Sequence, residues 1–448
     1  MQGDAQGWGS LPFCSPYWFM GNNLRNGSCR RDEATEESMS MDSFFKKLGE
    51  LVYAQWKMQN FDLTLFPEIA RKALEKCNPS KHVDLHDVIH EFLLQDDQPF
   101  QSSSGFGQPE LILYDNPKFY IQALFWLDGT TDIHQHEFSG AFHVMAGSSI
   151  HSTYDFDAPK AITAHFRLGN LKLRDVALLK TGSTVPITSG RACIHSLFHL
   201  ETPSVTIVIR THSDPGTGPQ FTYLPPHVAL DPVQQDTLTT RRKQLLDVLE
   251  QTQSPDYTDL VAAMLGELDF ERGFFILQNC IGYLRNLETW EQVWGVFVKK
   301  HGNLAAPVKV TLEEIIRRDA LTAMRSRIED VEHRFFLVVL INLERREDIL
   351  RLVAKQGHGD ALATIISWAE ELIQITDSGL WMLDAKLPWI TGLEEEDHPL
   401  IFLKALHYLI KGESSRGKIP TELKSLGARN FAQIKEIFFR SSWRVLIR

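Results

Sequence analysis

The chain has 448 residues, of which 43% are apolar and 23% are charged, and such a composition is ordinary for a globular protein of two or three domains. The formal net charge of -11 argues against nucleic acid as a general partner, because phosphate binding needs a basic surface. Five scattered cysteines without a CxxC pair exclude a disulfide framework and a zinc knuckle, and are typical of a reducing compartment.

The sequence shows no membrane or export signal. Its longest apolar run, residues 335–341, is far too short to cross a bilayer. The N-terminus lacks the basic start and apolar core of a signal peptide, so we expect a cytoplasmic protein. Residues 1–40 are rich in Gly, Asn, Ser and charge without periodicity, and we expect them to be disordered.

Residues 41–105 are predicted to form a helical N-terminal segment. Apolar residues recur at helical spacing as Phe44, Leu48 and Leu51, with Asp42 able to cap the start. A second helix is expected at about residues 80–94.

Residues 106–228 are predicted to form β-strands. Four stretches are rich in β-branched and aromatic residues and are separated by glycines: 118–126, 141–147, 149–156 and 203–211. Short strands at close spacing predict a small antiparallel barrel or sandwich.

Residues 229–448 read as a large all-α C-terminal region. The predicted fold class is therefore α+β and multi-domain, with a β-barrel between two helical parts. The C-terminal helices could cover the barrel mouth, form a homodimer interface, or bind a protein partner or a carrier-bound substrate, and the sequence does not choose between these roles.

Histidines carry the main functional signal. Eight of the 17 fall between residues 134 and 212, and two of them form the stretch DIHQH. Alternate residues of a strand share a face, so His134 and His136 can coordinate one metal ion. A third ligand must come from another strand, and GRACIHSLFHL offers His195 and His199.

Three stretches resemble the cupin barrel of the cysteine dioxygenase type. KFYIQALFWLDGTTDIHQH is similar to that family's strand, turn and first histidine pair, AFHVMAG to its next strand and glycine turn, and IHSLFHLETPSVTIVIRT to its late strands. The resemblance implies an antiparallel double-stranded β-helix with metal ligands His134, His136 and His195. Gly140 stands where ordinary cupins add a glutamate, which implies an all-histidine site.

The resemblance fails on the residues that recognise cysteine. The family's alternating serine, histidine and tyrosine correspond to Thr206, Val208 and Arg210. The family's substrate-binding arginine has no clear match, so we expect that free cysteine is not the substrate. Arg210 is our candidate catalytic residue, as an anion contact from another wall of the barrel.

Three neutral imidazoles leave the charge of a divalent ion uncompensated and leave coordination positions open. Imidazole suits iron(II), and the resemblance to the cysteine dioxygenase type implies this metal. We therefore expect a non-haem iron(II) oxygenase that brings O₂ and a small, anionic substrate together, with nickel, zinc, copper or manganese as alternatives to iron. The rival interpretation is a non-enzymatic ligand-sensing or protein-interaction module on a degenerate cupin barrel.

The remaining histidines have simpler interpretations. His199 could support or replace His195. His143 and His151 are more typical of structural barrel residues, and the helical stripe of His82, His86 and His90 is more typical of a solvated or inter-domain face.

Overall fold

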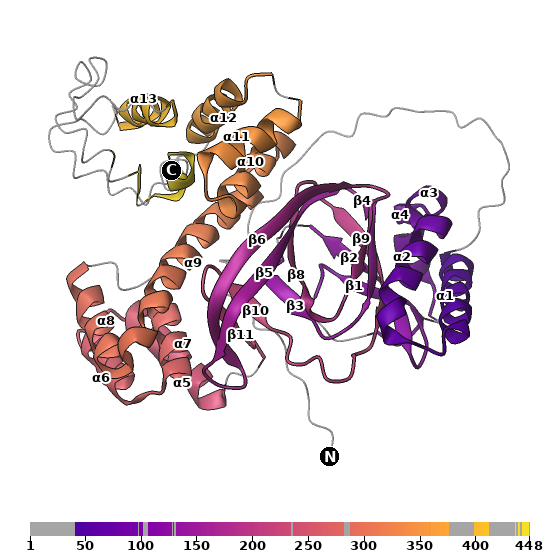
Figure 1. The fold of residues 1–448 in the computed structure, drawn as a ribbon, viewed down its shortest axis with the longest axis horizontal. Helices are drawn as coiled ribbons and strands as arrows, with labels where there is room; N and C mark the ends of the chain where they lie inside the picture. The colour runs from indigo at the N-terminus through magenta and orange to yellow at the C-terminus, as the bar shows by residue number, and fades with distance from the viewer. Residues whose placement is uncertain are drawn as a thin grey trace.

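The computed structural model describes residues 41–447 apart from residues 97, 102–105, 128, 130, 234–235, 282–286, 358, 376–397, 412–434, 436–437 and 440. Strands lie in the middle, with helices α1–α4 on one side and helices α5–α13 on the other (Figure 1). The mixed α+β class and the helical C-terminal region are confirmed. The expected disorder of residues 1–40 lies outside the described residues.

Four N-terminal helices pack on the first sheet: α1 (Met41–Met58), α2 (Phe66–Cys77), α3 (Pro79–His82) and α4 (Leu85–Leu94). Helix α2 contacts strands β4 (Gly140–Ala146) and β7 (Thr184–Ile187), and α1 contacts β1 (Glu110–Asp115). The shared core includes Phe45, Phe66 and Phe119, whose side chains are completely buried. Burial of each such aromatic ring stabilises the contact by roughly 2–3 kcal/mol.

The predicted single helix over residues 80–94 is wrong. Val83 is extended, with φ −126° and ψ 125°, and it ends α3. The carboxylate of Asp84 then accepts a hydrogen bond from the backbone N–H of His86 and caps the start of α4. His82 consequently lies on a different helix from His86 and His90, whose ring centroids are 4.0 Å apart.

Eleven strands follow: β1 (Glu110–Asp115), β2 (Phe119–Trp126), β3 (Ile133–His136), β4 (Gly140–Ala146), β5 (Ser148–Ala161), β6 (Phe166–Lys180), β7 (Thr184–Ile187), β8 (Gly190–His199), β9 (Ser204–Thr211), β10 (Thr222–Leu224) and β11 (Val228–Leu230). One five-stranded sheet has the order β1-β2-β9-β4-β7. The other six strands close into an antiparallel barrel in the order β10-β11-β6-β5-β8-β3. The predicted antiparallel barrel is confirmed at this level.

Apolar side chains of both strand groups meet between them. Leu124, Phe142 and Val208 from the five-stranded sheet pack with Leu179 and Leu197 from the barrel strands. His134, His136 and His195 border this layer, whose opposite walls come from strands distant in sequence.

The C-terminal part consists of α5 (Thr237–Gln251), α6 (Tyr257–Glu267), α7 (Phe270–Cys280), α8 (Leu287–His301), α9 (Ala306–Met324), α10 (Val331–Asn342), α11 (Arg346–Lys355), α12 (Ala361–Ile375), α13 (His398–Ile410) and the 3-10 helix η8 (Ser442–Leu446). None of the helices in the described ranges combines the length and apolar character needed to cross a membrane.

These helices pack directly on the barrel. Ile150 and Phe198 of the barrel share a core with α10, which is buried from His333 to Asn342. At the end of β8, the Arg325 side chain donates to the carbonyl of His199 at 2.6 Å, and Arg334 donates to the carbonyl of Leu200 at 2.6 Å. The helical part thereby holds the strand that carries His195.

Candidate metal centre

Strands β3 and β8 bring His134, His136 and His195 together. The side chains of His134 and His136 point to the same side of β3, as strand alternation predicts. The intervening Gln135 points to the other side, where it accepts a hydrogen bond from the hydroxyl of Tyr223 at 2.6 Å. His134 pairs with His195 in the antiparallel register of β3 and β8, so the third imidazole comes from the neighbouring strand.

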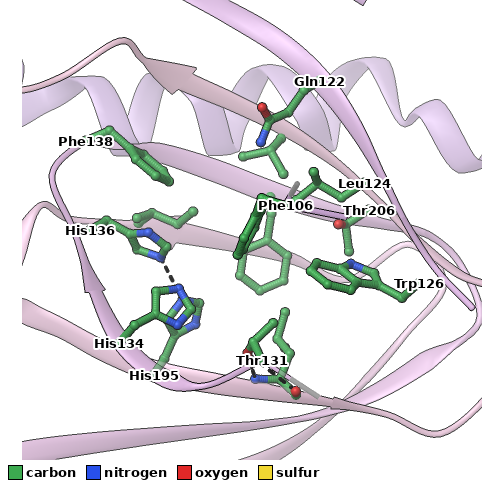
Figure 2. A pocket seen from close by; sticks show the side chains of 14 residues that line it. Phe106, Gln122, Leu124, Trp126, Thr131, His134, His136, Phe138, His195 and Thr206 are labelled. Atoms are coloured by element: carbon green, nitrogen blue, oxygen red, sulfur yellow. Dashed lines mark hydrogen bonds between the residues drawn. The ribbon is translucent and has the colours of Figure 1, made fainter. Parts of the chain in front are cut away.

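The three imidazoles are close enough to hold one metal ion. One ring nitrogen from each residue lies within 4.8 Å of the others. The Nε2 atoms of His136 and His195 are 2.7 Å apart, and all three rings face the same space (Figure 2). Each residue is buried, with at most 6% of its surface exposed.

The hydrogen bonds of His134 fix its protonation pattern. Its Nδ1 lies 2.7 Å from the carbonyl oxygen of Asp132. A carbonyl can only accept, so Nδ1 carries the proton and the Nε2 of the neutral ring has a lone pair. This buried Nε2 has no hydrogen-bond partner among the described residues. An unpartnered lone pair facing two further imidazoles fits a metal ion.

His195 is supported from behind by another histidine. Its Nδ1 lies 2.9 Å from Nε2 of His151 on β5. With the proton on Nδ1 of His195, the lone pair of Nε2 points toward His136. The barrel histidine His151 is therefore a hydrogen-bond partner of a candidate ligand.

Burial keeps the candidate ligands neutral. It lowers the pKa of His134, and it lowers the pKa values of His136 and His195 well below the usual histidine value, with neighbouring histidines adding to the effect. A metal ligand must offer an unprotonated nitrogen, so the neutral form is the one that binds.

Gly140 cannot be replaced by a residue with a carboxylate without displacing the backbone. A Cβ atom at this position would lie 2.0 Å from the carbonyl oxygen of Ile209 on the adjacent strand β9. The space beside the Cα atom of Gly140 is thus filled by a neighbouring main chain. No carboxylate belongs to the metal-competent group found among the described residues.

The other histidines lie outside this group. The His199 ring stacks on Trp126 with ring centroids 4.8 Å apart, and its Nδ1 is 2.8 Å from the hydroxyl of Ser149. His143 bridges the hydroxyls of Thr184 and Ser80 at 2.8 and 3.1 Å, which ties α3 to β4. His195, not His199, is the residue that joins His134 and His136.

The candidate ligands border a cavity of about 40 Å³ with mostly apolar walls. Two polar groups in these walls have buried atoms without a partner among the described residues, the amide oxygen of Gln122 and the indole nitrogen of Trp126 (Figure 2). Both residues lie on β2, and sequence reasoning missed them. A glutamine inside the apolar run YIQALFW was the signal available.

Arg210 stands beside this cavity and does not line it. Its guanidinium carbon lies 3.4 Å from the ring centroid of Phe138, a residue that does line the cavity. Its Nε and Nη2 donate to the backbone carbonyls of Thr211 and His212, both at 3.3 Å. Thr206 and Val208, at the same strand parity, are in the cavity wall. The catalytic role of Arg210 stays a prediction.

No protein-family description and no curated protein matches the chain. Among solved structures, it is similar to hydroquinone 1,2-dioxygenase PnpCD in complex with Cd²⁺ and 4-hydroxybenzonitrile, at 19% identity and a TM-score of 0.18. The match covers 23% of this chain and 63% of that one, so the chain spans less than two thirds of its neighbour. A likeness this weak carries no argument about function.

Proposed function

We propose that the protein is a non-haem iron(II) oxygenase built on a cupin barrel, with His134, His136 and His195 as the metal ligands. The observation that carries the proposal is the buried, unpartnered Nε2 lone pair of His134 beside the facing Nε2 atoms of His136 and His195. A purely structural histidine cluster would leave this desolvated acceptor unpaired at a cost of roughly 1–3 kcal/mol.

The ligand set is compatible with iron(II) and favours an anionic substrate atom. Imidazole nitrogen suits first-row divalent ions, and three neutral ligands leave the full double charge to attract an anionic donor. Bound iron(II) would supply open coordination positions and the redox chemistry that activates O₂. The protein residues hold the ion, shape the cavity and exclude water.

The cavity walls suggest how the rest of the substrate is held. Apolar residues such as Leu124, Phe142 and Val208 favour an apolar body. Gln122 and Trp126 offer the substrate hydrogen-bond partners. Arg210 contacts the face of Phe138, and its positive charge contributes to lowering the pKa of His136. We propose that the same charge favours an anion bound in the cavity.

Metal content and O₂ consumption test this function. The purified full chain is analysed for metals, reconstituted with iron(II) under anaerobic conditions, and assayed for O₂ uptake with small anionic substrates. We expect one iron per chain and substrate-dependent O₂ uptake in the wild type, with both lost in His195→Ala and the metal retained in His199→Ala. Stoichiometric metal without O₂ uptake for any substrate would favour the binding-module interpretation, and absence of metal would contradict both the ligand set and the enzyme.

A further inference from the structure

A second cavity lies between strands of the barrel and the C-terminal helices. Its volume is about 270 Å³, and it is bordered by residues of β5, β6, α9, α10 and η8. Tyr154 and Leu173 come from the barrel side, whereas Arg317, Arg318 and Arg444 come from the helical side. The candidate metal ligands do not line it, so this cavity is a separate feature of the molecule.

Three guanidinium groups converge on one carboxylate at this cavity. Arg317 forms a bidentate ion pair with Glu314: Nε donates to Oε2 at 2.8 Å, and Nη2 donates to Oε1 at 2.6 Å. Arg318 donates from Nε to the same carboxylate at 2.9 Å, and Arg444 donates from Nη2 at 2.5 Å. The side chains of Glu314 and Arg317 are 10% and 7% exposed, so the cluster lies in a poorly solvated region.

The arginines differ in how many of their donors are used. A guanidinium has five N–H donors. Arg317 also donates to the carbonyls of Leu340 and Ile341 at the end of α10, so it is nearly saturated. Within the described part of the chain, Arg318 and Arg444 make hydrogen bonds to Glu314 alone. Both are about four-fifths buried, at 19% and 20% exposed, and both line the cavity.

The nearby carboxylates do not match the positive charge. Glu314 already forms the bidentate ion pair with Arg317. Glu344 lines the cavity as well, but it is exposed to solvent. Asp319 attracts Arg318 electrostatically, yet it does not line the cavity and makes no ion pair with Arg318. Burial lowers the pKa of Arg317, the contact with Glu314 opposes this shift, and the charges of Arg318 and Arg444 lower the pKa further.

We propose that this cavity, the arginine cavity, binds a small oxyanion between Arg318 and Arg444. The ligand class is a phosphate or carboxylate group, because a planar guanidinium donates two parallel hydrogen bonds to such groups. The oxyanion would accept the unused donors and compensate the excess charge. The cavity lies where the barrel meets α9, α10 and η8. A bound anion would therefore also stabilise the contact between the barrel and the C-terminal helices.

The test uses the full chain after metal removal, so that an anion cannot bind to iron. Inorganic phosphate and malonate are titrated calorimetrically in separate experiments, against sodium chloride at equal ionic strength. The wild type is expected to bind at least one of the two saturably, and the preferred probe distinguishes a phosphate site from a carboxylate site. Arg318→Gln and Arg444→Gln each remove charge-assisted hydrogen bonds and are expected to weaken binding roughly tenfold.

Two further variants separate the site from general charge effects. Arg345→Gln removes an exposed arginine that pairs with Asp348 and does not line the cavity, and the affinity of this variant should equal that of the wild type. Val310→Phe keeps every arginine but fills the cavity from its half-exposed wall, and it should abolish binding. No saturable binding in the wild type, or wild-type affinity in Val310→Phe, would overturn the proposal and would leave the proposed iron site untouched.

Discussion

The Nε2 atom of His151 lies 2.9 Å from the Nδ1 atom of His195, and both side chains are buried. This contact joins β5 to the candidate ligand strand β8, with Ser152 and Ser196 paired beside it in the antiparallel register. With the proton on Nδ1 of His195, His151 accepts this hydrogen bond, and Nε2 of His195 keeps the lone pair that a metal would bind.

Replacing His151 should weaken metal binding without removing a ligand. His151→Phe removes the acceptor, and we expect the affinity for iron(II) or zinc(II) to fall about 10- to 100-fold. His151→Gln can still accept from Nδ1–H and should stay within a few-fold of the wild type. Competition with a chromogenic chelator measures both, and His165→Ala, a half-exposed histidine paired with Asp231, is the control. Equal losses in the Phe and Gln variants would show that packing, and not the acceptor, matters.

Each of the three candidate ligands should be required for metal. His134→Ala, His136→Ala and His195→Ala are expected to lose most of the bound metal while keeping the circular dichroism spectrum of the wild type, because the rings border a cavity and the larger apolar clusters are built by other residues. His199→Ala should keep its metal, since Nδ1 of His199 is bonded to Ser149. Elemental analysis decides the matter: full metal content in His195→Ala would move the third ligand elsewhere.

Arg210 should affect anion affinity and not metal content. In the cobalt-substituted protein, azide is a small anionic probe that reports its binding through the visible spectrum. Arg210→Gln removes a charge close behind Phe138, and we expect the Kd for azide to rise roughly threefold or more. Arg167→Gln, whose guanidinium stacks on Phe221, is the matched control. An unchanged Kd in Arg210→Gln would remove this residue from the proposed site.

Acid should destabilise the protein partly through His143. Burial lowers its pKa to about 4 in the folded chain, against 6.5 for an ordinary histidine. Below pH 6.5 His143 is protonated in the unfolded chain but stays neutral in the folded chain. The free energy of unfolding therefore falls as the pH drops from 6.5 toward 4. The loss attributable to this group between pH 7.5 and pH 5 is about 2 kcal/mol.

Urea denaturation at the two pH values measures that loss. His143→Gln cannot titrate, and its free energy of unfolding should depend less on pH than that of the wild type. His82→Gln, at an exposed position, should keep the wild-type dependence. The same pH dependence in His143→Gln and the wild type would show that other groups control the acid response.

Local sequence was sufficient for the features that depend on periodicity. Alternation in IHQH placed His134 and His136 on one face, and the apolar texture of residues 118–126 and 203–211 located β2 and β9. These predictions succeeded because strand alternation is a property of the backbone itself. The helical C-terminal region followed from 3.6-residue periodicity for the same kind of reason.

Tertiary structure decided which distant residues meet. Strand β5 extends to Ala161, well beyond the predicted end at residue 156, because its polar second half pairs with β6 in a long hairpin. The contact of His151 with His195, and the exposure of Gln122 and Trp126 to the same cavity, depend on cross-strand register and on how the two groups of strands face each other. The arginine cavity likewise exists because Arg444 packs beside Glu314, a residue 130 positions earlier. Local periodicity carries no information about such pairings, since they are fixed by the packing of the whole chain.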